Sequence, residues 1–308
     1  MLTVAGPSPA VDITYVVDDY RLGQIHRPTT VARCAGGKAL NMARAARQVG
    51  ADVALTTILG GATGGWIAEE LEAEGVATTV VPGSLDTRTC VSVASAATGT
   101  LTEVYEHAPD TPPALWARLC DGLDELLSRR PGWLSTSGSM PRQLPADTLA
   151  ALVRLGRRRG VAVALDSHGA MLAPALDEGP DLVKVNRVEA AAALDADSDG
   201  DLGEMARALA GRTGGTVVLT DGAAGAVGWD GSRLVRAVLP DVHGDYPVGS
   251  GDSFLGGLLA GLDAGAGLAE ALRTAIACGA ANALVPGAAR FDPAEVGRLA
   301  ERVSIEGR

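Results

Sequence analysis

The chain has 308 residues, of which 47% are hydrophobic and 20% charged, a composition typical of a globular protein with a sizeable core. Its formal net charge of −11 argues against nucleic acid and anionic membrane surfaces as partners. Its apolar runs stop well short of the roughly 18 residues that a membrane span needs, and no signal peptide is visible at the N-terminus. Cys34, Cys90, Cys120 and Cys278 lie far apart and form no CxxC pair, which is typical of thiols in a reducing cytosol. We therefore expect a cytoplasmic protein.

The first third of the chain alternates strands and helices but carries two β-rich insertions. Residues 12–34 contain two ribbon segments joined by a polar turn, and residues 87–106 alternate around a turn at Thr98-Gly99. We expect the two insertions to pair as a small sheet beside the main domain. The other predicted elements here are strands at Leu2–Ala5, Val53–Ile58 and Thr78–Val81, a helix that residues 35–41 open and Gly50 closes, and a helix at Trp66–Glu74.

From residue 115 onward the alternation is regular. Strands are predicted at 133–136, Val161–Asp166, Leu182–Val185 and Thr216–Thr220, helices at 114–129, 146–159, 188–194 and 202–213, then a hairpin at 226–238 and helices at 252–263, 268–284 and 294–303. Strands that alternate with helices of ten or more residues indicate an α/β fold, a mainly parallel sheet with helices on both faces. No fixed-period repeat and no low-complexity linker is visible, so we expect a single domain over residues 1–308.

Polar residues follow the predicted strands of the second half where these strands end. They include Ser137 to Ser139, Asp166, Asn186 and Asp221. Open parallel sheets bind ligands outside the carboxyl ends of their strands. This pattern predicts a binding site at that edge without naming its ligand.

The segment YPVGSGDSFLGGLLAGL at 246–262 joins a glycine-rich turn to an apolar helix. Gly249 and Gly251 free the backbone, and the apolar spacing that follows places the start of the helix near Asp252. A helix N-terminus suits a phosphate, because its first N–H groups are unpaired and its end is partly positive. Asp252 is then either a cap and dipole partner or a general base beside an anion hole. The spacing alone leaves both interpretations open.

Lysine is almost absent from the chain. Of the 26 Lys and Arg residues, 24 are Arg, and only Lys38 and Lys184 are Lys. Lys38 follows the pair Gly36-Gly37 and precedes Asn41 in the first turn of a predicted helix. The segment is no Walker P-loop, because alanines stand at the required first glycine and at the Ser/Thr position. Glycine amides, an ammonium and an amide suit a phosphorylated polyol, and a tight turn with an exposed lysine is the alternative.

Three further turns follow predicted strands. GGATGG at 60–65 fails the GxGxxG spacing of a dinucleotide site, so we expect a tight turn there. Asn186 and Glu189 share a helical face and suit the water shell of Mg²⁺, the alternative being a helix cap with a surface acid. The turn Thr220–Gly225 suits a nucleotide phosphate or is a plain hairpin entry.

Taken together, these segments resemble the PfkB carbohydrate kinase family of the ribokinase superfamily. The matching pieces, whose order and spacing are specific, are PAVD at 9–12, GGKALN at 36–41, Thr87-Arg88, SGSMP at 137–141, KVNRVE at 184–189, LTDGAAG at 219–225 and VGSGDS at 248–253. The resemblance covers nearly the whole chain. It implies a ribokinase-like fold, a mainly parallel sheet flanked by helices, with the small β-sheet as a lid.

The resemblance also implies the roles of individual residues. Asp252 is the catalytic base, and the amides of Gly249, Ser250, Gly251 and Asp252 form the anion hole. The residues implied to hold the substrate are Asp12, Gly36, Gly37, Lys38, Asn41, Arg88 and Ser139. Those implied to lie near ATP are Lys184, Asn186, Thr220, Asp221, Gly222, Gly225 and Asn282. Asn186 and Glu189 are then the pair near Mg²⁺, acting through water.

Within the family, Lys38 and Arg88 are similar to residues of the phosphosugar branch, the 1-phosphofructokinases, tagatose-6-phosphate kinases and minor 6-phosphofructokinases. Both positions approach the phosphate that the sugar already carries. The implied reaction is transfer of the ATP γ-phosphoryl to a hydroxyl of a ketohexose monophosphate, with fructose 1-phosphate preferred over tagatose 6-phosphate and fructose 6-phosphate. The alternatives are a kinase of an unphosphorylated sugar or nucleoside and a non-catalytic sugar-phosphate-binding protein. Free strand edges on the lid indicate a homodimer.

Overall fold

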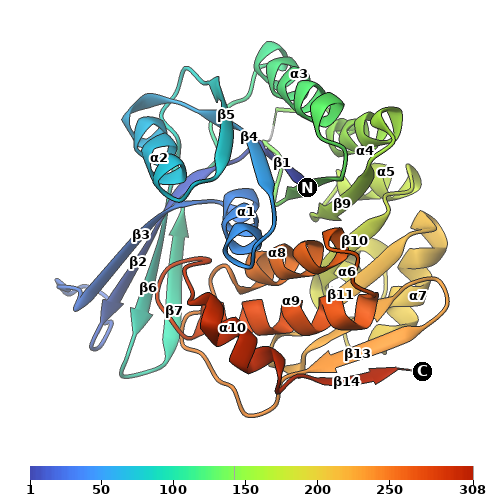
Figure 1. The fold of residues 1–308 in the computed structure, drawn as a ribbon. Helices are drawn as coiled ribbons and strands as arrows, with labels where there is room; N and C mark the ends of the chain where they lie inside the picture. Colours follow the sequence, from blue (N-terminus) through green and yellow to red (C-terminus); the bar gives the residue numbers. More distant parts are fainter. Residues whose placement is uncertain (142, 308) are drawn as a thin grey trace.

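The computed structural model describes residues 1–141 and 143–307. A 10-stranded sheet runs through its centre in the order β14-β13-β12-β11-β10-β9-β8-β1-β4-β5 (Figure 1). Its strands are β1 (Leu2–Gly6), β4 (Val53–Leu59), β5 (Ala77–Pro82), β8 (Trp133–Ser137), β9 (Ala162–Asp166), β10 (Leu182–Asn186), β11 (Thr216–Thr220), β12 (Ala226–Trp229), β13 (Leu234–Val238) and β14 (Ser304–Gly307). Seven neighbouring strands of this sheet are parallel, namely β11, β10, β9, β8, β1, β4 and β5. Strands β12, β13 and β14 continue the sheet in antiparallel pairing.

Helices cover both faces of this sheet, as the alternation predicted. The first core cluster contains apolar side chains of α1 (Lys38–Gln48), α2 (Gly61–Ala73), α8 (Ser250–Asp263), α9 (Leu268–Ala283) and α10 (Pro293–Ala300). The second contains those of α3 (Pro113–Arg129), α4 (Thr148–Arg159), α5 (Leu172–Asp177), α6 (Arg187–Leu194) and α7 (Leu202–Thr213). Because the inner strands are buried on both faces, they read as apolar runs such as TVVLT in β11.

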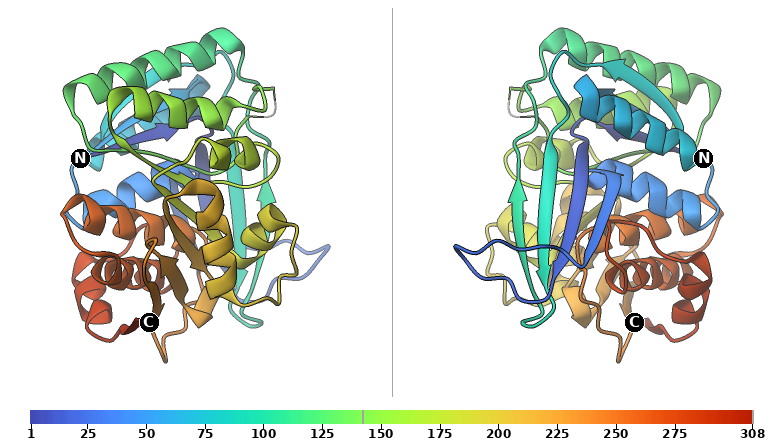
Figure 2. Two further views of the ribbon diagram at one scale, coloured as in Figure 1. Left: turned by 90° about the vertical axis from the view of Figure 1, so that its right-hand side faces the viewer. Right: turned by 90° about the vertical axis from the view of Figure 1, so that its left-hand side faces the viewer.

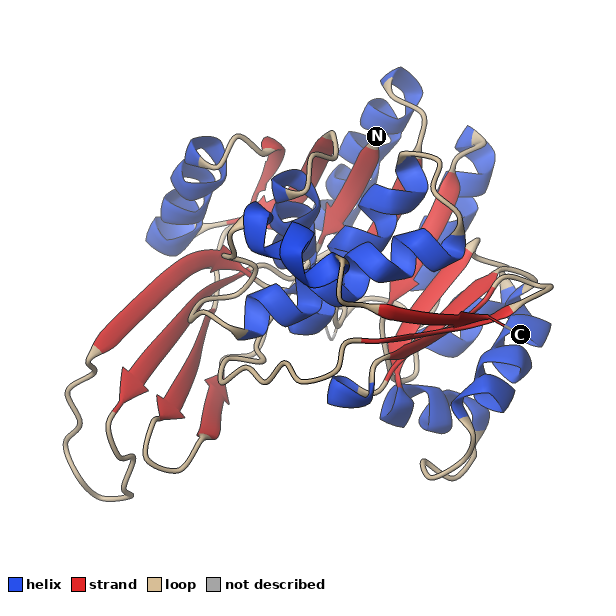
Figure 3. Ribbon diagram, turned by 60° about the horizontal axis from the view of Figure 1, so that its bottom comes forward, coloured by secondary structure: helices blue, strands red, loops and turns tan. Residues whose placement is uncertain are grey.

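The two β-rich insertions form a separate four-stranded sheet, which we call the small sheet. Its order is β3-β2-β6-β7, from β2 (Ala10–Val17), β3 (Thr30–Gly36), β6 (Thr89–Ser95) and β7 (Thr100–Tyr105). The small sheet extends away from the helical layers (Figure 3). The connection between β2 and β3, dark blue in Figure 2, reaches out beyond the strands. The predicted pairing of the insertions is confirmed.

Two of the differences from the predicted boundaries have a clear physical cause. Helix α2 begins at Gly61 rather than at Trp66. Residues 83–87 pack so closely on this turn that a Cβ at Gly61 would lie 1.4 Å from the Asp86 carboxylate, so the glycines are needed there although the helix has already begun. At the C-terminus, α10 ends at Ala300, and β14 follows as an unpredicted strand paired with β13. The four residues of β14 carry no strand signal of their own. They form a strand because the edge of β13 supplies the hydrogen-bonding partners.

The topology places one edge of the sheet for ligand binding. From β1 the chain proceeds to β4 and β5 on one side, whereas β8 to β11 extend the sheet on the other side. The direction of winding therefore changes between β1 and β8, the position where open α/β sheets bind ligands at the carboxyl ends of their strands. Within the described residues no helix is both long and apolar enough to cross a membrane.

Candidate active site

Register brings the predicted site residues to one edge. Ser137 at the end of β8 pairs with Asp166 at the end of β9, and Asn186 at the end of β10 pairs with Thr220 at the end of β11. The N-termini of α1, α6 and α8 begin at this edge or pack against it. Residues from most of the length of the chain thus surround the start of α8.

The start of α8 offers unpaired backbone donors. Gly249 adopts φ +83°, and a Cβ there would lie 2.7 Å from the Ala288 Cβ, so only glycine fits. The Ser250 N–H is bonded to the Pro247 carbonyl at 3.0 Å. For the N–H groups of Gly249, Gly251 and Asp252 no acceptor is found in residues 1–141 and 143–307. Three of the four predicted anion-hole amides are therefore free, and that of Ser250 is occupied.

Asp252 lies in the first turn of α8, but it does not cap the helix by a side-chain hydrogen bond. Its side chain is buried, and its Oδ2 accepts a hydrogen bond from Asn41 Nδ2 at 3.1 Å. Burial raises the pKa of Asp252 to about 6, against the opposing effect of the nearby Lys38 ammonium. A carboxylate with a pKa near neutrality can accept and release a proton at physiological pH.

Asp12 occupies the other side of Asn41. Asp12 Oδ2 accepts hydrogen bonds from the Gly37 N–H at 3.0 Å and from Asn41 Nδ2 at 3.2 Å. A Cβ at Gly36 would lie 2.1 Å from the Asp12 carboxylate, and Gly37 has φ +87°. The glycine pair therefore admits Asp12 to the helix N-terminus, and Asn41 joins Asp12 to Asp252.

Both lysines of the chain act on Asp166. Lys184 Nζ donates to Asp166 Oδ2 at 2.9 Å, and both side chains are buried. A Cβ at Gly251 would lie 3.2 Å from the same Nζ, so this ammonium lies directly under the start of α8. Lys38 is half-exposed, and although burial acts against it, the carboxylates of Asp166, Asp252 and Glu189 raise its pKa. Two cations and a helix N-terminus thus face the same space.

Arg88 is held at the base of the small sheet. Its guanidinium donates to the carbonyls of Pro9 at 3.4 Å, Ser8 at 3.3 Å and Glu106 at 3.1 Å. Its charge also opposes the burial that raises the pKa of Asp12. Ser139 is exposed, directly after Gly138, whose added Cβ would lie 3.3 Å from the Lys38 Cβ. Arg88 and Ser139 therefore border the region of Asp12 and Lys38.

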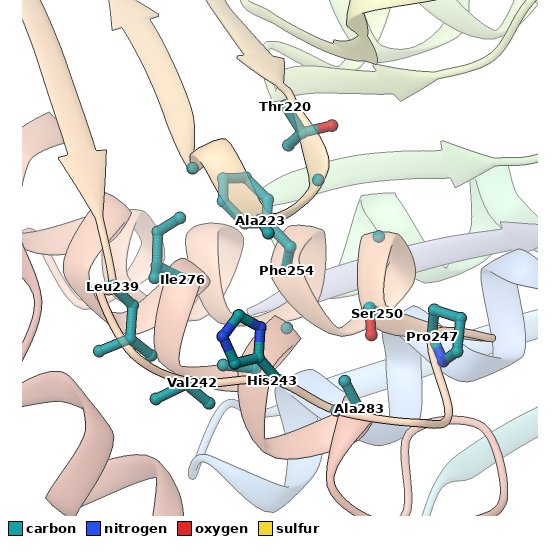
Figure 4. Close-up of a pocket in the computed structure, with 16 residues that line it drawn as sticks. Thr220, Ala223, Leu239, Val242, His243, Pro247, Ser250, Phe254, Ile276 and Ala283 are labelled. Atoms are coloured by element: carbon teal, nitrogen blue, oxygen red, sulfur yellow. The ribbon is translucent and has the colours of Figure 1, made fainter. Parts of the chain in front are cut away.

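A cavity of about 390 Å³ lies beside the α8 N-terminus, and neither Asp12 nor Lys38 lines it (Figure 4). Thr220, Gly222 and Gly225 of the predicted turn line it, but Asp221 does not. In Figure 4, Leu239 and Ile276 lie at one end of the cavity and Ser250 at the other. Most of the lining is apolar. A mainly apolar pocket with one polar end suits a molecule with a flat apolar part and a charged tail.

Asn186 and Glu189 form a capping box at the start of α6. Asn186 Oδ1 accepts from the Glu189 N–H at 2.9 Å, and Glu189 Oε2 accepts from the Asn186 N–H at 2.9 Å. Glu189 Oε1 remains directed at the site, 3.6 Å from His168 Nδ1 and 4.0 Å from Lys38 Nζ. Among the residues described, no three His, Cys, Asp or Glu are grouped to hold a metal ion. The protein alone offers carboxylate oxygens, not a complete metal site.

Two predicted nucleotide residues support the site from outside the cavity. Asp221 forms a two-point ion pair with Arg187, whose Nε and Nη2 lie 3.0 and 2.9 Å from its oxygens. Asn282 is fully buried behind the glycine-rich turn: its Nδ2 donates to the Val248 carbonyl at 2.8 Å and to Ser250 Oγ at 3.0 Å. These contacts hold the two turns in place, and neither side chain lines the cavity; their position near ATP stays a prediction.

Two further residues lie at this site and were not predicted from the sequence. His168 lies in the loop after β9, 3.6 Å from Glu189 Oε1, and the sequence of that loop contains no recognisable motif. Arg44 lies three residues after Asn41 on the same helical face and donates to Asn41 Oδ1 at 3.2 Å. The three-residue spacing from Asn41 was the only signal in the sequence. It was not specific, because the chain contains 24 arginines.

Known proteins share this arrangement. Residues 8–295 match the family described as pfkB family carbohydrate kinase. The 1-phosphofructokinase of Rhodobacter capsulatus is 34% identical over 283 residues, 90% of this chain and 89% of its own length. The tagatose-6-phosphate kinase of Staphylococcus epidermidis is 29% identical over 282 residues, 90% of each chain.

Solved structures agree with these sequence relatives. The phosphofructokinase-2 of Escherichia coli, in its complex with substrates and products, superimposes with a TM-score of 0.89 at 25% identity and 98% coverage of both chains. The Thermotoga maritima chain described as a "possible 1-phosphofructokinase" has a TM-score of 0.89 at 20% identity, a likeness of fold. The chain therefore belongs to the PfkB family and is an ATP-dependent carbohydrate kinase.

Proposed function

We propose that this kinase transfers the γ-phosphoryl group of ATP to a hydroxyl of a ketohexose monophosphate, giving a bisphosphate and ADP. Fructose 1-phosphate is the first candidate, because the 34% identical relative is a 1-phosphofructokinase, whereas the tagatose-6-phosphate kinase is 29% identical. One observation carries the proposal. The buried Asp252 lies at a helix N-terminus with free amides, between an apolar cavity and a region that contains Lys38 and Arg88.

Each part of the site has a role in this reaction. Asp252 accepts the proton of the attacking hydroxyl, which its pKa of about 6 allows at neutral pH. The free amides of Gly249, Gly251 and Asp252 and the buried Lys184 ammonium stabilise charge on the transferring group. Asp12 and Asn41 hold sugar hydroxyls, and Lys38 and Arg88 hold the phosphate that the sugar already carries. Gly36, Gly37 and Ser139 shape the same pocket.

The nucleotide occupies the 390 Å³ cavity, with its base at the apolar end and its phosphates toward Ser250. Thr220, Gly222 and Gly225 border it, while Asp221 and Asn282 support it from outside. Mg²⁺ keeps several waters and binds largely through substrate phosphates, so an incomplete protein site suits it. Glu189 Oε1 and Asn186 would hold it through water, and when bound it would neutralise phosphate charge.

The small sheet acts as a lid of the single kinase domain. It carries Asp12 on β2 and Arg88 at the start of β6, so its movement opens and closes the sugar side of the site. Closure excludes water that would otherwise hydrolyse ATP. We further propose that two copies of the chain associate through the exposed face of this sheet. Free thiols, three of them buried, suit a cytoplasmic enzyme.

The test is ADP release with Mg·ATP and four acceptors: fructose 1-phosphate, tagatose 6-phosphate, fructose 6-phosphate and free fructose. We expect turnover of a phosphosugar, led by fructose 1-phosphate, and a kcat lower by roughly 10² to 10⁴ in Asp252→Asn, the usual contribution of a positioned base. An Asp252→Asn enzyme with the kcat of the wild type would contradict the assignment of the base.

The alternative is a kinase of an unphosphorylated sugar or nucleoside. Lys38 and Arg88 distinguish the two functions, because only a phosphosugar needs them. If the substrate carries a phosphate, Arg88→Ala raises its KM and leaves that of ATP nearly unchanged. If turnover is confined to free fructose, or if Arg88→Ala leaves both constants unchanged, the phosphosugar assignment is wrong.

A further inference from the structure

Arg44 is a buried charge that does not line the 390 Å³ cavity and reaches the sugar side of the site through Asn41. It lies in the second turn of α1, 3% exposed, and each of its three guanidinium nitrogens donates at least one hydrogen bond. Nε donates to Glu74 Oε2 at 2.8 Å, and Nη2 donates to the Ala35 carbonyl. Nη1 donates to Asn41 Oδ1 at 3.2 Å and to the Ala288 carbonyl at 3.4 Å. Burying a guanidinium is costly unless it is paired and hydrogen-bonded, and Arg44 meets both conditions.

The contact with Asn41 decides which way that amide points. An amide side chain has an acceptor oxygen and a donor nitrogen on opposite sides. Because Arg44 offers only donors, it holds the Asn41 oxygen toward itself and turns the nitrogen toward Asp12 and Asp252, 3.2 and 3.1 Å away. In the opposite orientation the Asn41 oxygen would face two carboxylates, and its nitrogen would face the guanidinium. Both carboxylates would then repel the amide oxygen, and the guanidinium would repel the amide N–H groups.

We propose that Arg44 is a positioning residue for phosphoryl transfer, which through Asn41 keeps the base Asp252 and the sugar-binding Asp12 joined by one amide. The proposal rests on the proposed function of Asp252 and Asp12. Glu74 fixes Arg44 from the other side, and Glu74 is itself bonded to Arg290 at 2.9 Å. The contact with the Ala288 carbonyl extends the same support to the loop that packs on Gly249.

Loss of Arg44 has a consequence that a purely structural residue would not produce. Asn41 becomes free to rotate, and Asp252 loses a donor that stabilises its charged form. The pKa of Asp252 then rises further above its present value of about 6, so the acid limb of the rate profile moves to higher pH. Asp12 loses the same donor together with the opposing charge of Arg44, so binding of the sugar weakens as well.

The experiment compares wild type with Arg44→Ala in two measurements. In the first, kcat/KM for the phosphosugar is measured against pH, and we expect a fall on the order of 10²-fold, as for a small misplacement of catalytic groups, with the acid limb moved upward and the KM of ATP nearly unchanged. In the second, the Asp252 carboxyl is titrated by ¹³C NMR in the free enzyme, with Asp252→Asn identifying its signal. The titration reports the effect of Arg44 on Asp252 through Asn41 without any turnover. It therefore separates failure of this proposal from failure of the proposed function.

Chemical rescue sharpens the test. Arg44 itself lines a cavity of about 340 Å³, together with residues that include Arg47, Gln48 and Arg290. Free guanidinium ion can enter there and fill the space that Arg44→Ala leaves. We expect guanidinium chloride at non-denaturing concentration to return the acid limb toward its original pH, and sodium chloride at equal concentration to have no such effect.

Arg47→Ala is the matched control. Arg47 lies one turn further along α1, is exposed, and donates to the Gly75 carbonyl at 3.1 Å, so its removal should leave the rate profile unchanged. If Arg44→Ala does not fold, Arg44→Lys keeps the charge but lacks the fork that reaches Asn41 and Glu74 together, and it should show the same upward movement. A folded Arg44 variant with a lower melting temperature but the kcat and Asp252 titration of the wild type would overturn the proposal.

Discussion

At the scale of single residues, the chemistry depends on how carboxylates and cations are grouped. Asp252 and Asp166 are both buried, yet the pKa of Asp252 is raised by burial, whereas Lys184 and Lys38 outweigh burial and hold the pKa of Asp166 below its usual value. The difference lies in the partners: Asp166 has a direct ion pair, and Asp252 has one neutral amide donor and cations at longer range. One acid is thereby prepared to exchange a proton, and the other stays charged.

This difference predicts the pH dependence of the reaction. A base must be deprotonated to act, so activity is present above the pKa of Asp252 and lost as the pH falls through about 6, by about tenfold per unit below it. The second ionisation of a sugar phosphate also lies near pH 6, so the rate profile is compared with a ¹³C titration of Asp252 in the free enzyme. A carboxyl that titrates near 4 would contradict the raised pKa.

At the scale of elements, two glycine turns decide what the helix N-termini can hold. The turn before α8 leaves amides free, and the turn before α1 admits the Asp12 carboxylate from the small sheet. The start of α6 instead caps itself through Asn186 and Glu189. The three helix starts at this edge thus differ in what pairs with their N–H groups, and local sequence decides the difference.

Gly36→Ala tests the turn before α1. Its Cβ would lie 2.1 Å from the Asp12 carboxylate, so Asp12 must move, and we expect kcat/KM for the phosphosugar to fall roughly 10²-fold. The control is Gly65→Ala in α2, where an added Cβ meets nothing within 4 Å, and alanine should stabilise the helix by up to about 1 kcal/mol. Steady-state kinetics and thermal unfolding of both variants check this, and full activity in Gly36→Ala would refute the close fit.

At the scale of the whole molecule, the small sheet presents an apolar face that is partly uncovered. Cross-strand pairing places Ile13, Val91 and Val104 on one face of it, and Tyr15 pairs with Val31 on the same face. Val31 is 48% exposed and Val104 67%. Apolar residues gathered on one exposed sheet face are typical of a protein interface. A sheet that carries Asp12 and Arg88 would also link the sites of two associated copies.

We predict a dimer that a charge on this face disrupts. Val104→Asp should give a monomer in analytical ultracentrifugation at concentrations where the wild type is dimeric, because an aspartate buried in the interface lacks a partner. Val80→Asp is the control, since Val80 is 40% exposed on β5 of the large sheet. A monomeric wild type, or equal dissociation of both variants, would exclude association through this face.

Much of this protein follows from the sequence by itself. Alternating apolar segments determine the parallel sheet and its two helical layers, because buried parallel strands and amphipathic helices have distinct periods. The site is marked in the sequence by the glycine turns before α1 and α8 and by the two lysines of the chain. Phosphate binding needs free backbone amides and a small number of cations at the right positions. The order of these motifs identifies the family, which the comparisons confirm.

Only the tertiary structure decided how these parts act on one another. Nothing local distinguishes Arg44 from 23 other arginines, or shows that Lys184 lies under Gly251, because both facts depend on contacts between elements far apart in the chain. The same holds for Asp221 and Asn282, which support turns instead of lining the cavity, and for β14, which is a strand only because β13 offers it an edge. Burial, which sets the pKa of Asp252, is likewise a property of the assembled fold.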